Sequence, residues 1–206
     1  ALLIGEALEV EFVDWSQLLP ASRSIAVTAK TDHNSIPVHH CSATDDGWFL
    51  STPLQHRPAC QFRYSPEHVS DDVAATHVER FVGELGPEAL ALSNLRSGHR
   101  QHMWRNNCVA LGAAAGWVEP LDISNFHFLM NGLSRLTALL PTLAMQDSLD
   151  TLFNREMTEQ LACVRDFALL HYHSAQWRDT PFWNAARESE KPDSLRRRVE
   201  LFSSSG

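Results

Sequence analysis

Two carboxylates flank a proline in the middle of this chain. Glu119 and Asp122 are three residues apart, and Pro120 between them forces the backbone to bend. Ser124 follows, where a helix is expected to begin. A carboxylate at such a place can cap the helix N-terminus, or it can act as a base or position a reacting electrophile. The residues by themselves leave both roles open.

A run of small residues precedes this bend. A short apolar strand, expected over residues 108–111, leads into five of them: Gly112, Ala113, Ala114, Ala115 and Gly116. Glycine and alanine let a ligand come close to the backbone, and a helix start offers N–H groups to an anion. Tight packing of a strand against a helix explains the same residues equally well.

The sequence around these features resembles the flavin-dependent tryptophan halogenases. From Trp104 to Leu121 it reads tryptophan, two residues, Asn-Cys-Val-Ala, glycine and small residues, then Val-Glu-Pro-Leu. Residues 47–57, which begin Gly-Trp, resemble the family's tryptophan-x-tryptophan-x-isoleucine-proline box. Further stretches resemble the family in the same order, at residues 12–16, 153–155, 165–167, 171–172 and 179–183. The resemblance therefore covers residues 1–190.

The resemblance implies a reaction and its participants. In this family, reduced flavin reacts with oxygen and chloride to give hypochlorous acid, which passes to a lysine at a separate site where an electron-rich ring is chlorinated. It implies FAD in its reduced form as cofactor, with chloride or bromide as co-substrate. It also implies a small aromatic substrate of the tryptophan or indole type, and a separate flavin reductase as partner.

The resemblance also assigns roles to residues. Asp122 stands where the family has the acid near its lysine, and it is one methylene shorter than the usual glutamate. Ser124 and Asn125 stand at the halide-binding positions, where backbone groups do most of the binding. Residues 112–116 would contact the flavin through their backbone.

The tryptophan box is only partly matched. Trp48 and Pro53 agree with it, whereas Leu50 and Thr52 depart from it. In the family this box separates the substrate from the flavin, so its erosion favours an alternative function, that of a flavin-dependent aromatic monooxygenase that hydroxylates its substrate. Trp48 is also explained as an ordinary aromatic residue of a sheet.

Several family features are missing from the sequence. It contains no G-x-G-x-x-G dinucleotide fingerprint. Lys30 and Lys191 are its two lysines, and their polar surroundings do not match the family's catalytic lysine. The family's C-terminal substrate-clamping aromatics are absent too. We therefore expect part of a halogenase, inactive by itself; a non-catalytic fragment that acts only as a binding module is the other possibility.

The elements expected to position these residues are strands first and helices later, an α+β arrangement. An antiparallel sheet should precede a helical region, within a fold that the resemblance implies is like the flavin monooxygenases. A turn at residues 44–46 predicts a hairpin, and Ser70 predicts a helix N-cap, with the helix stopping at residues 86–87. Apolar stripes at residues 124–140 and 148–172 predict core-facing helices. The expected parts are a sheet-rich part at 1–68, a halide-site turn with a helical substrate region at 69–190, and a disordered tail at 191–206.

Composition excludes several classes of protein. The chain has 206 residues, and its net charge of −8 opposes binding to nucleic acid or anionic lipid. No stretch reaches the ~18 uncharged apolar residues of a membrane span. The four cysteines form no CxxC pair and no secretory segment is evident, which predicts a cytoplasmic protein. The histidines at 39–40 and at 171 and 173 diverge in direction, so no metal site is expected.

Overall fold

The computed structural model describes residues 2–28, 38–55, 58–83, 91–119, 121, 124–140, 146–175 and 177–204. The chain divides into two compact units that interleave along the sequence. The helical unit comprises Ala1–Gln17, Arg96–His171 and Lys191–Gly206, and the sheet unit comprises Leu18–Leu95 and Tyr172–Glu190. The chain passes from one unit to the other after residue 190, where the sequence suggests a boundary, but not near residue 68, where the sequence suggests another.

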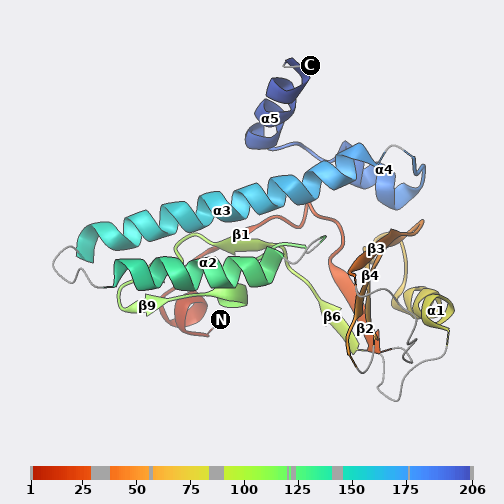
Figure 1. Ribbon diagram of the computed structural model, residues 1–206, viewed down its shortest axis with the longest axis horizontal. Helices are drawn as coiled ribbons and strands as arrows, with labels where there is room; N and C mark the ends of the chain where they lie inside the picture. The colour runs from red at the N-terminus through yellow and green to blue at the C-terminus, as the bar shows by residue number, and fades with distance from the viewer. Residues whose placement is uncertain are drawn as a thin grey trace. The chain divides into compact units, whose positions relative to one another are not determined.

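The sheet unit is built on a five-stranded antiparallel sheet with the strand order β3-β4-β5-β2-β6 (Figure 1). Its strands are β2 (Arg23–Thr28), β3 (His40–Ala43), β4 (Gly47–Pro53), β5 (Pro58–Tyr64) and β6 (Ala91–Asn94). The hairpin predicted at residues 44–46 joins β3 to β4, with Ala43 opposite Trp48. The predicted antiparallel sheet is confirmed.

Helix α1 (Asp71–Val82) begins where the sequence predicts. The Ser70 side chain accepts a hydrogen bond from the Val73 N–H at 3.4 Å, which is the geometry of an N-cap. The helix ends earlier than expected, at Gly83, whose φ of 74° is left-handed. The expected stop at residues 86–87 lies outside the described residues. A glycine that adopts positive φ ends a helix without the steric penalty that a Cβ would bring.

One face of the sheet forms the core of this unit with α1. Phe49 and Phe62 stack at 4.5 Å between ring centroids, and Ala74 and Val78 of α1 are buried in the same cluster. Alternate residues of β4 and β5 supply these rings because side chains of a strand point to opposite faces in turn.

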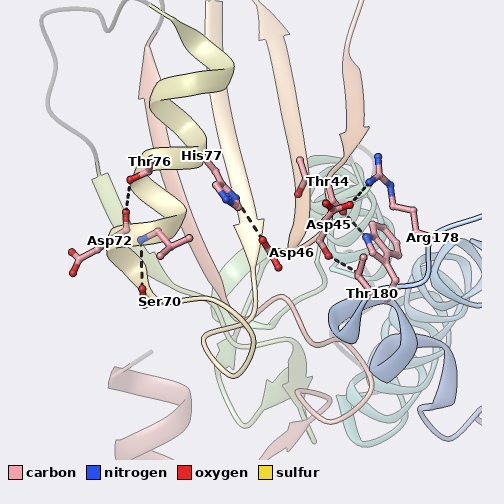
Figure 2. A network of polar contacts seen from close by, with 11 residues as sticks. Thr44, Asp45, Asp46, Ser70, Asp72, Thr76, His77, Arg178 and Thr180 are labelled. Carbon is pink, nitrogen blue, oxygen red and sulfur yellow. Dashed lines mark hydrogen bonds and ion pairs between the residues drawn. The ribbon is translucent and has the colours of Figure 1, made fainter.

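The hairpin turn is held by polar contacts from two directions, as Figure 2 shows. On one side, His77 Nδ1 lies 3.8 Å from an Asp46 carboxylate oxygen. On the other side lie α4 (Pro181–Glu188) and the segment that leads into it. They contribute hydrogen bonds from Arg178 to Asp45 Oδ1 at 2.7 Å, from Thr180 Oγ1 to Asp45 O at 2.6 Å and from Trp183 Nε1 to Thr44 O at 2.6 Å.

The helical unit carries the remaining elements. It opens with a π-helix, η1 (Leu2–Ala7), and has a three-stranded antiparallel sheet of order β1-β7-β10 and a β8-β9 pair. These strands are β1 (Phe12–Asp14), β7 (Gly98–Arg100), β8 (Trp104–Arg105), β9 (Cys108–Val109) and β10 (Gly116–Trp117). Its longer helices are α2 (Ser124–Leu139) and α3 (Gln146–Ser174), which lie side by side in Figure 1, with α5 at Asp193–Ser204. The last turn of α3, from Tyr172, belongs to the sheet unit.

Two expectations for these helices need correction. The apolar stripe of α2 does not face the core, because Phe126, Met130 and Leu133 are exposed. The packed side of α2 is instead the one that carries the buried Phe128 and Gly132. A Cβ at Gly132 would lie 3.0 Å from Leu111 and 3.2 Å from Met157. The glycine therefore lets α2 pack closely against these two side chains. Residues 193–204 are helical, in a segment for which the sequence predicts disorder.

None of the helices in the described part of the chain is long and apolar enough to cross a membrane.

Candidate functional site

The small-residue turn is a single turn of 3₁₀-helix, η2 (Gly112–Ala114), between β9 and β10. Gly112 has a φ of 55°, a backbone conformation that residues with a side chain rarely adopt. The Ala115 N–H closes the turn by donating to Gly112 O at 3.0 Å. Ala113 and Ala114 are exposed, so this part of the turn presents backbone and methyl groups that a flat ligand can reach.

The second part of the turn is buried. Ala115 is 1% exposed, and Gly116 pairs with His99 of β7. A Cβ at Gly116 would lie 2.8 Å from each of Gly98 O, His99 Cβ and Leu161 Cδ1. Protein packing therefore accounts for the small residues at 115 and 116, whereas packing does not account for the exposed pair at 113 and 114.

The bend after this turn is closed by one side chain. Asn125 Oδ1 accepts from the Val118 N–H at 3.2 Å, and Asn125 Nδ2 donates to Val118 O at 2.8 Å. The amide thus joins the two ends of the segment that contains the carboxylates. Glu119 is buried, at 1% exposed, and Asp122 lies outside the described residues.

Helix α2 starts immediately after the bend, at Ser124. The first turn of any helix carries N–H groups that have no carbonyl partner within the helix, and these attract anions. Since the side-chain amide of Asn125 is engaged with Val118, its contribution to a halide site would come from its backbone. The halide-binding role of Ser124 and Asn125 stays a prediction.

Asn154 of α3 holds the strand that leads into the turn. Its Oδ1 accepts from the N–H groups of Met103 and Trp104, at 2.8 and 2.7 Å, and its Nδ2 donates to Trp104 O at 2.9 Å. Sequence reasoning noted Asn154 only within a family-like stretch. An amide between the buried Phe153 and Met157 was the available signal, since a polar residue on a core-facing stripe must find partners.

We expect Asn154→Leu to destabilise the protein by about 3 kcal/mol, because two partly buried backbone N–H groups lose their acceptor. Asn154→Asp is the matched variant. It keeps the acceptor oxygen but loses the donor to Trp104 O, so its effect should be smaller. Urea unfolding of the two variants measures the difference, and equal losses would show that Oδ1 is not the important atom.

A buried histidine lies beside the same turn. His99 Nδ1 is 2.8 Å from Arg100 O, which can only accept, so Nδ1 carries the proton. The ring meets Trp15 edge-on at 4.9 Å, and the Arg165 guanidinium lies 4.8 Å from the Trp15 ring centroid. Burial lowers the pKa of His99, and the charge of Arg165 lowers it further. His99 is therefore a neutral packing residue behind Gly116.

This lowered pKa predicts a pH dependence of stability. The unfolded chain takes up a proton near pH 6.5, whereas folded His99 resists it, so the free energy of unfolding falls as the pH drops below that value. His99→Gln should show a smaller loss between about pH 7.5 and 5.5 in urea unfolding. His102→Gln, at an exposed neighbour, should keep the wild-type loss. A wild-type loss in both variants would exclude His99 as the source.

Comparison with known proteins identifies the family. The model of the tryptophan halogenase family matches residues 1–206. The chain belongs to this family. Among its relatives, tryptophan 6-halogenase ThaL of Streptomyces albogriseolus is 31% identical over 98% of this chain and 39% of that protein. The 7-chloro-L-tryptophan 6-halogenase KtzR of Kutzneria sp. is 28% identical over 98% of this chain and 40% of that protein.

Solved halogenase structures share the fold. Xcc4156, a flavin-dependent halogenase from Xanthomonas campestris, is 36% identical and superposes with a TM-score of 0.92 over 98% of this chain and 41% of that one. BrvH, a flavin-dependent halogenase from Brevundimonas sp. BAL3, is 33% identical with a TM-score of 0.91, over 98% of this chain and 41% of that one. The chain thus spans about 40% of the length of these halogenases, and the α+β fold expected from the sequence is confirmed.

The partly matched tryptophan box lies in the sheet unit. Trp48 is 1% exposed, and its Nε1 donates to the Tyr172 hydroxyl at 3.0 Å, while the Arg63 guanidinium lies 6.0 Å from its ring centroid. Pro53 ends β4 opposite Pro58 of β5. Trp48 is therefore a buried aromatic residue of the sheet unit.

Two histidines from the predicted clusters have hydrogen-bond partners nearby. His39 Nδ1 lies 3.0 Å from Thr52 Oγ1, and His171 Nδ1 lies 2.8 Å from Phe167 O. Within the described ranges, no three His, Cys, Asp or Glu side chains gather into a possible metal site.

Proposed function

We propose that the full-length protein is a flavin-dependent halogenase that acts on an electron-rich aromatic substrate of the tryptophan or indole type. It would use reduced FAD, oxygen and chloride or bromide. The observation that carries this proposal is the match of the tryptophan halogenase family over residues 1–206, which includes the turn, the bend and the start of α2. This chain spans about 40% of the length of its relatives, so the proposal concerns a longer protein that also has the other parts of such an enzyme.

The cofactor role belongs to the small-residue turn. Residues 112–114 would meet the flavin through their backbone, and the exposed methyl groups of Ala113 and Ala114 suit contact with a flat ring system. Ala115 and Gly116 would support this surface from behind, since both are buried. When bound, reduced flavin would supply the electrons that activate molecular oxygen, and that oxygen is the oxidant that turns halide into a halogenating agent.

The halide and acid roles belong to the bend. The first turn of α2, with Ser124 and Asn125, would hold the halide through backbone N–H groups, and the Asn125–Val118 clamp would fix where that turn begins. Asp122 would orient the oxidant or accept the proton that leaves the ring carbon when halogen replaces hydrogen. Trp48 and Pro53 would help to keep substrate and flavin apart.

The partners follow from this chemistry. A halogenase of this kind consumes reduced flavin, so a separate flavin reductase would supply it. We propose that the enzyme is cytoplasmic, because the reduced nicotinamide cofactor that the reductase needs is available in the cytoplasm.

The decisive experiment supplies the full-length protein with reduced FAD, oxygen and an indole-type substrate, with chloride, with bromide or without halide. Mass spectrometry should show a product that carries the halogen offered and none without halide. A product heavier by one oxygen, formed equally without halide, would overturn the halogenase proposal.

That second outcome defines the alternative function, a flavin-dependent aromatic hydroxylase. Leu50 and Thr52 favour it, because they depart from the box that separates substrate from flavin in the family. A chain that binds a partner without turnover of any kind would correspond to the binding-module alternative.

A further inference from the structure

The five-stranded sheet has a second face, turned away from α1. The core cluster of the sheet unit fills the face that packs against α1 (Figure 1). Because side chains of a strand alternate between faces, Trp48 and Leu50 of the tryptophan box lie on the second face. Residues directly opposite each other in an antiparallel pair share a face. In β5, Arg63 is opposite Trp48, and Gln61 is opposite Leu50, so both belong to the second face.

The second face is buried around Trp48 and more open farther along β4. Trp48 and Arg63 are both buried. Leu50, Thr52 and Gln61 are partly exposed. A molecule that lies beside the box can therefore reach Leu50 and Gln61, and the proposed halogenation gives Gln61 no role so far.

Arg63 sets the orientation of the Gln61 amide. Arg63 Nη2 donates to Gln61 Oε1 at 2.7 Å, and since a guanidinium can only donate, the amide atom that faces it is the oxygen. The Arg63 guanidinium is itself 6.0 Å from the centroid of the Trp48 ring. Gln61 Nε2 has no acceptor within the described part of the chain. The amide thus offers its two N–H groups, in a fixed orientation, at a partly exposed position.

The charge on this face restricts what Gln61 can bind. Among the described strands of the sheet, Arg63 is the one charged side chain on the second face, and no carboxylate lies there. A buried cation attracts an anionic group and repels a cationic one. N–H groups in turn require an acceptor, and hydrogen bonds to an ionised acceptor are the stronger ones. A carboxylate meets both conditions.

We propose that Gln61 determines substrate specificity by donating through Nε2 to a carboxylate on the side chain of an indole-type substrate. Arg63 is then a positioning residue, because it acts on the substrate through the Gln61 amide. The inference rests on the proposed function, since it takes the tryptophan box as the place beside which the substrate lies. It adds a substrate class to that function, aromatic acids.

The test titrates the full-length protein, loaded with FAD, with indole-3-acetate and with 3-isobutylindole, whose side chain has the same branched shape without oxygen. Calorimetry measures both affinities. Gln61→Met keeps the length of the side chain but removes the N–H groups, so it should weaken indole-3-acetate about tenfold and leave 3-isobutylindole unchanged. Equal changes for the two compounds would overturn the proposed recognition. Absence of binding of either compound to the wild type at millimolar concentration would overturn the site.

Gln61→Glu guards against a loss of folding. It keeps the oxygen that accepts from Arg63 and removes the N–H groups, so the sheet should stay intact while indole-3-acetate binds at least as weakly as to Gln61→Met. Ser93→Ala is the matched control, at an exposed position of β6 on the same face. It should leave both affinities unchanged. Binding of indole-3-acetate to Gln61→Glu at the wild-type affinity, or an equal loss in Ser93→Ala, would contradict the proposal.

The titration involves no turnover, so its result is separate from that of the halide experiment. A protein that hydroxylates its substrate but shows the selective effect of Gln61→Met would lose the halogenase function and keep this substrate site. A protein that halogenates its substrate but shows no selective effect would keep the function, and the role of Gln61 would be overturned.

Discussion

Asp122→Asn in the full-length protein should lower the rate of halogenated product formation by about 100-fold or more, while reduced FAD binds as before. The amide keeps the size of the side chain but can neither accept a ring proton nor carry the negative charge that would orient the oxidant. Single-turnover halogenation with preformed reduced flavin measures the chemical step, and flavin fluorescence measures binding.

Asp122→Glu is the matched control for this prediction. It restores the side-chain length usual in the family, so halogenation should stay at or above the wild-type rate. Unchanged turnover in Asp122→Asn would exclude the role proposed for this carboxylate. A parallel loss of flavin binding would indicate a structural effect of the substitution.

Gly98→Ala should destabilise the protein by about 3 kcal/mol or more, through both steric overlap and backbone strain. Gly98 has φ of 146°, and a Cβ there would lie 2.1 Å from Val13 O of β1. The backbone oxygen cannot move without disturbing the pairing of β1 with β7. The thermal midpoint should fall by roughly 10 °C.

Gly83→Ala separates the two causes. Gly83 also has positive φ, at 74°, but a Cβ there would meet nothing within 4 Å. This variant should cost about 1 kcal/mol, from backbone strain alone. If both variants lowered the thermal midpoint equally, close packing between β7 and β1 would not be the reason that position 98 requires glycine.

The parts of the fold that the sequence predicts well are those set by neighbouring residues. The hairpin turn at residues 44–46 and the Ser70 cap depend on local chemistry, and both are found at the predicted positions. The exposed face of α2 was missed because its apolar residues recur at helical spacing. Such a pattern shows that a face is apolar, but it does not show which side is covered within this chain.

The contacts that hold the candidate site in place join residues that are far apart in the sequence. Asn154 reaches Trp104 across 50 positions, and Gly116 meets His99 across the β7–β10 pairing. No local sequence pattern predicts either contact. The exposure of Ala113 and Ala114 against the burial of the next two residues also follows from this pairing, which is why the sequence could not divide the five small residues into two groups.

We propose that the start of α2 holds a halide beside the turn at residues 112–114. The most direct test is a crystal structure of the full-length protein grown with bromide, with anomalous scattering used to locate the ion. We expect a bromide peak within about 3.5 Å of the backbone nitrogens of Ser124 or Asn125, the range of a hydrogen bond to a large anion. A protein that brominates its substrate, yet binds bromide only at other places, would contradict it.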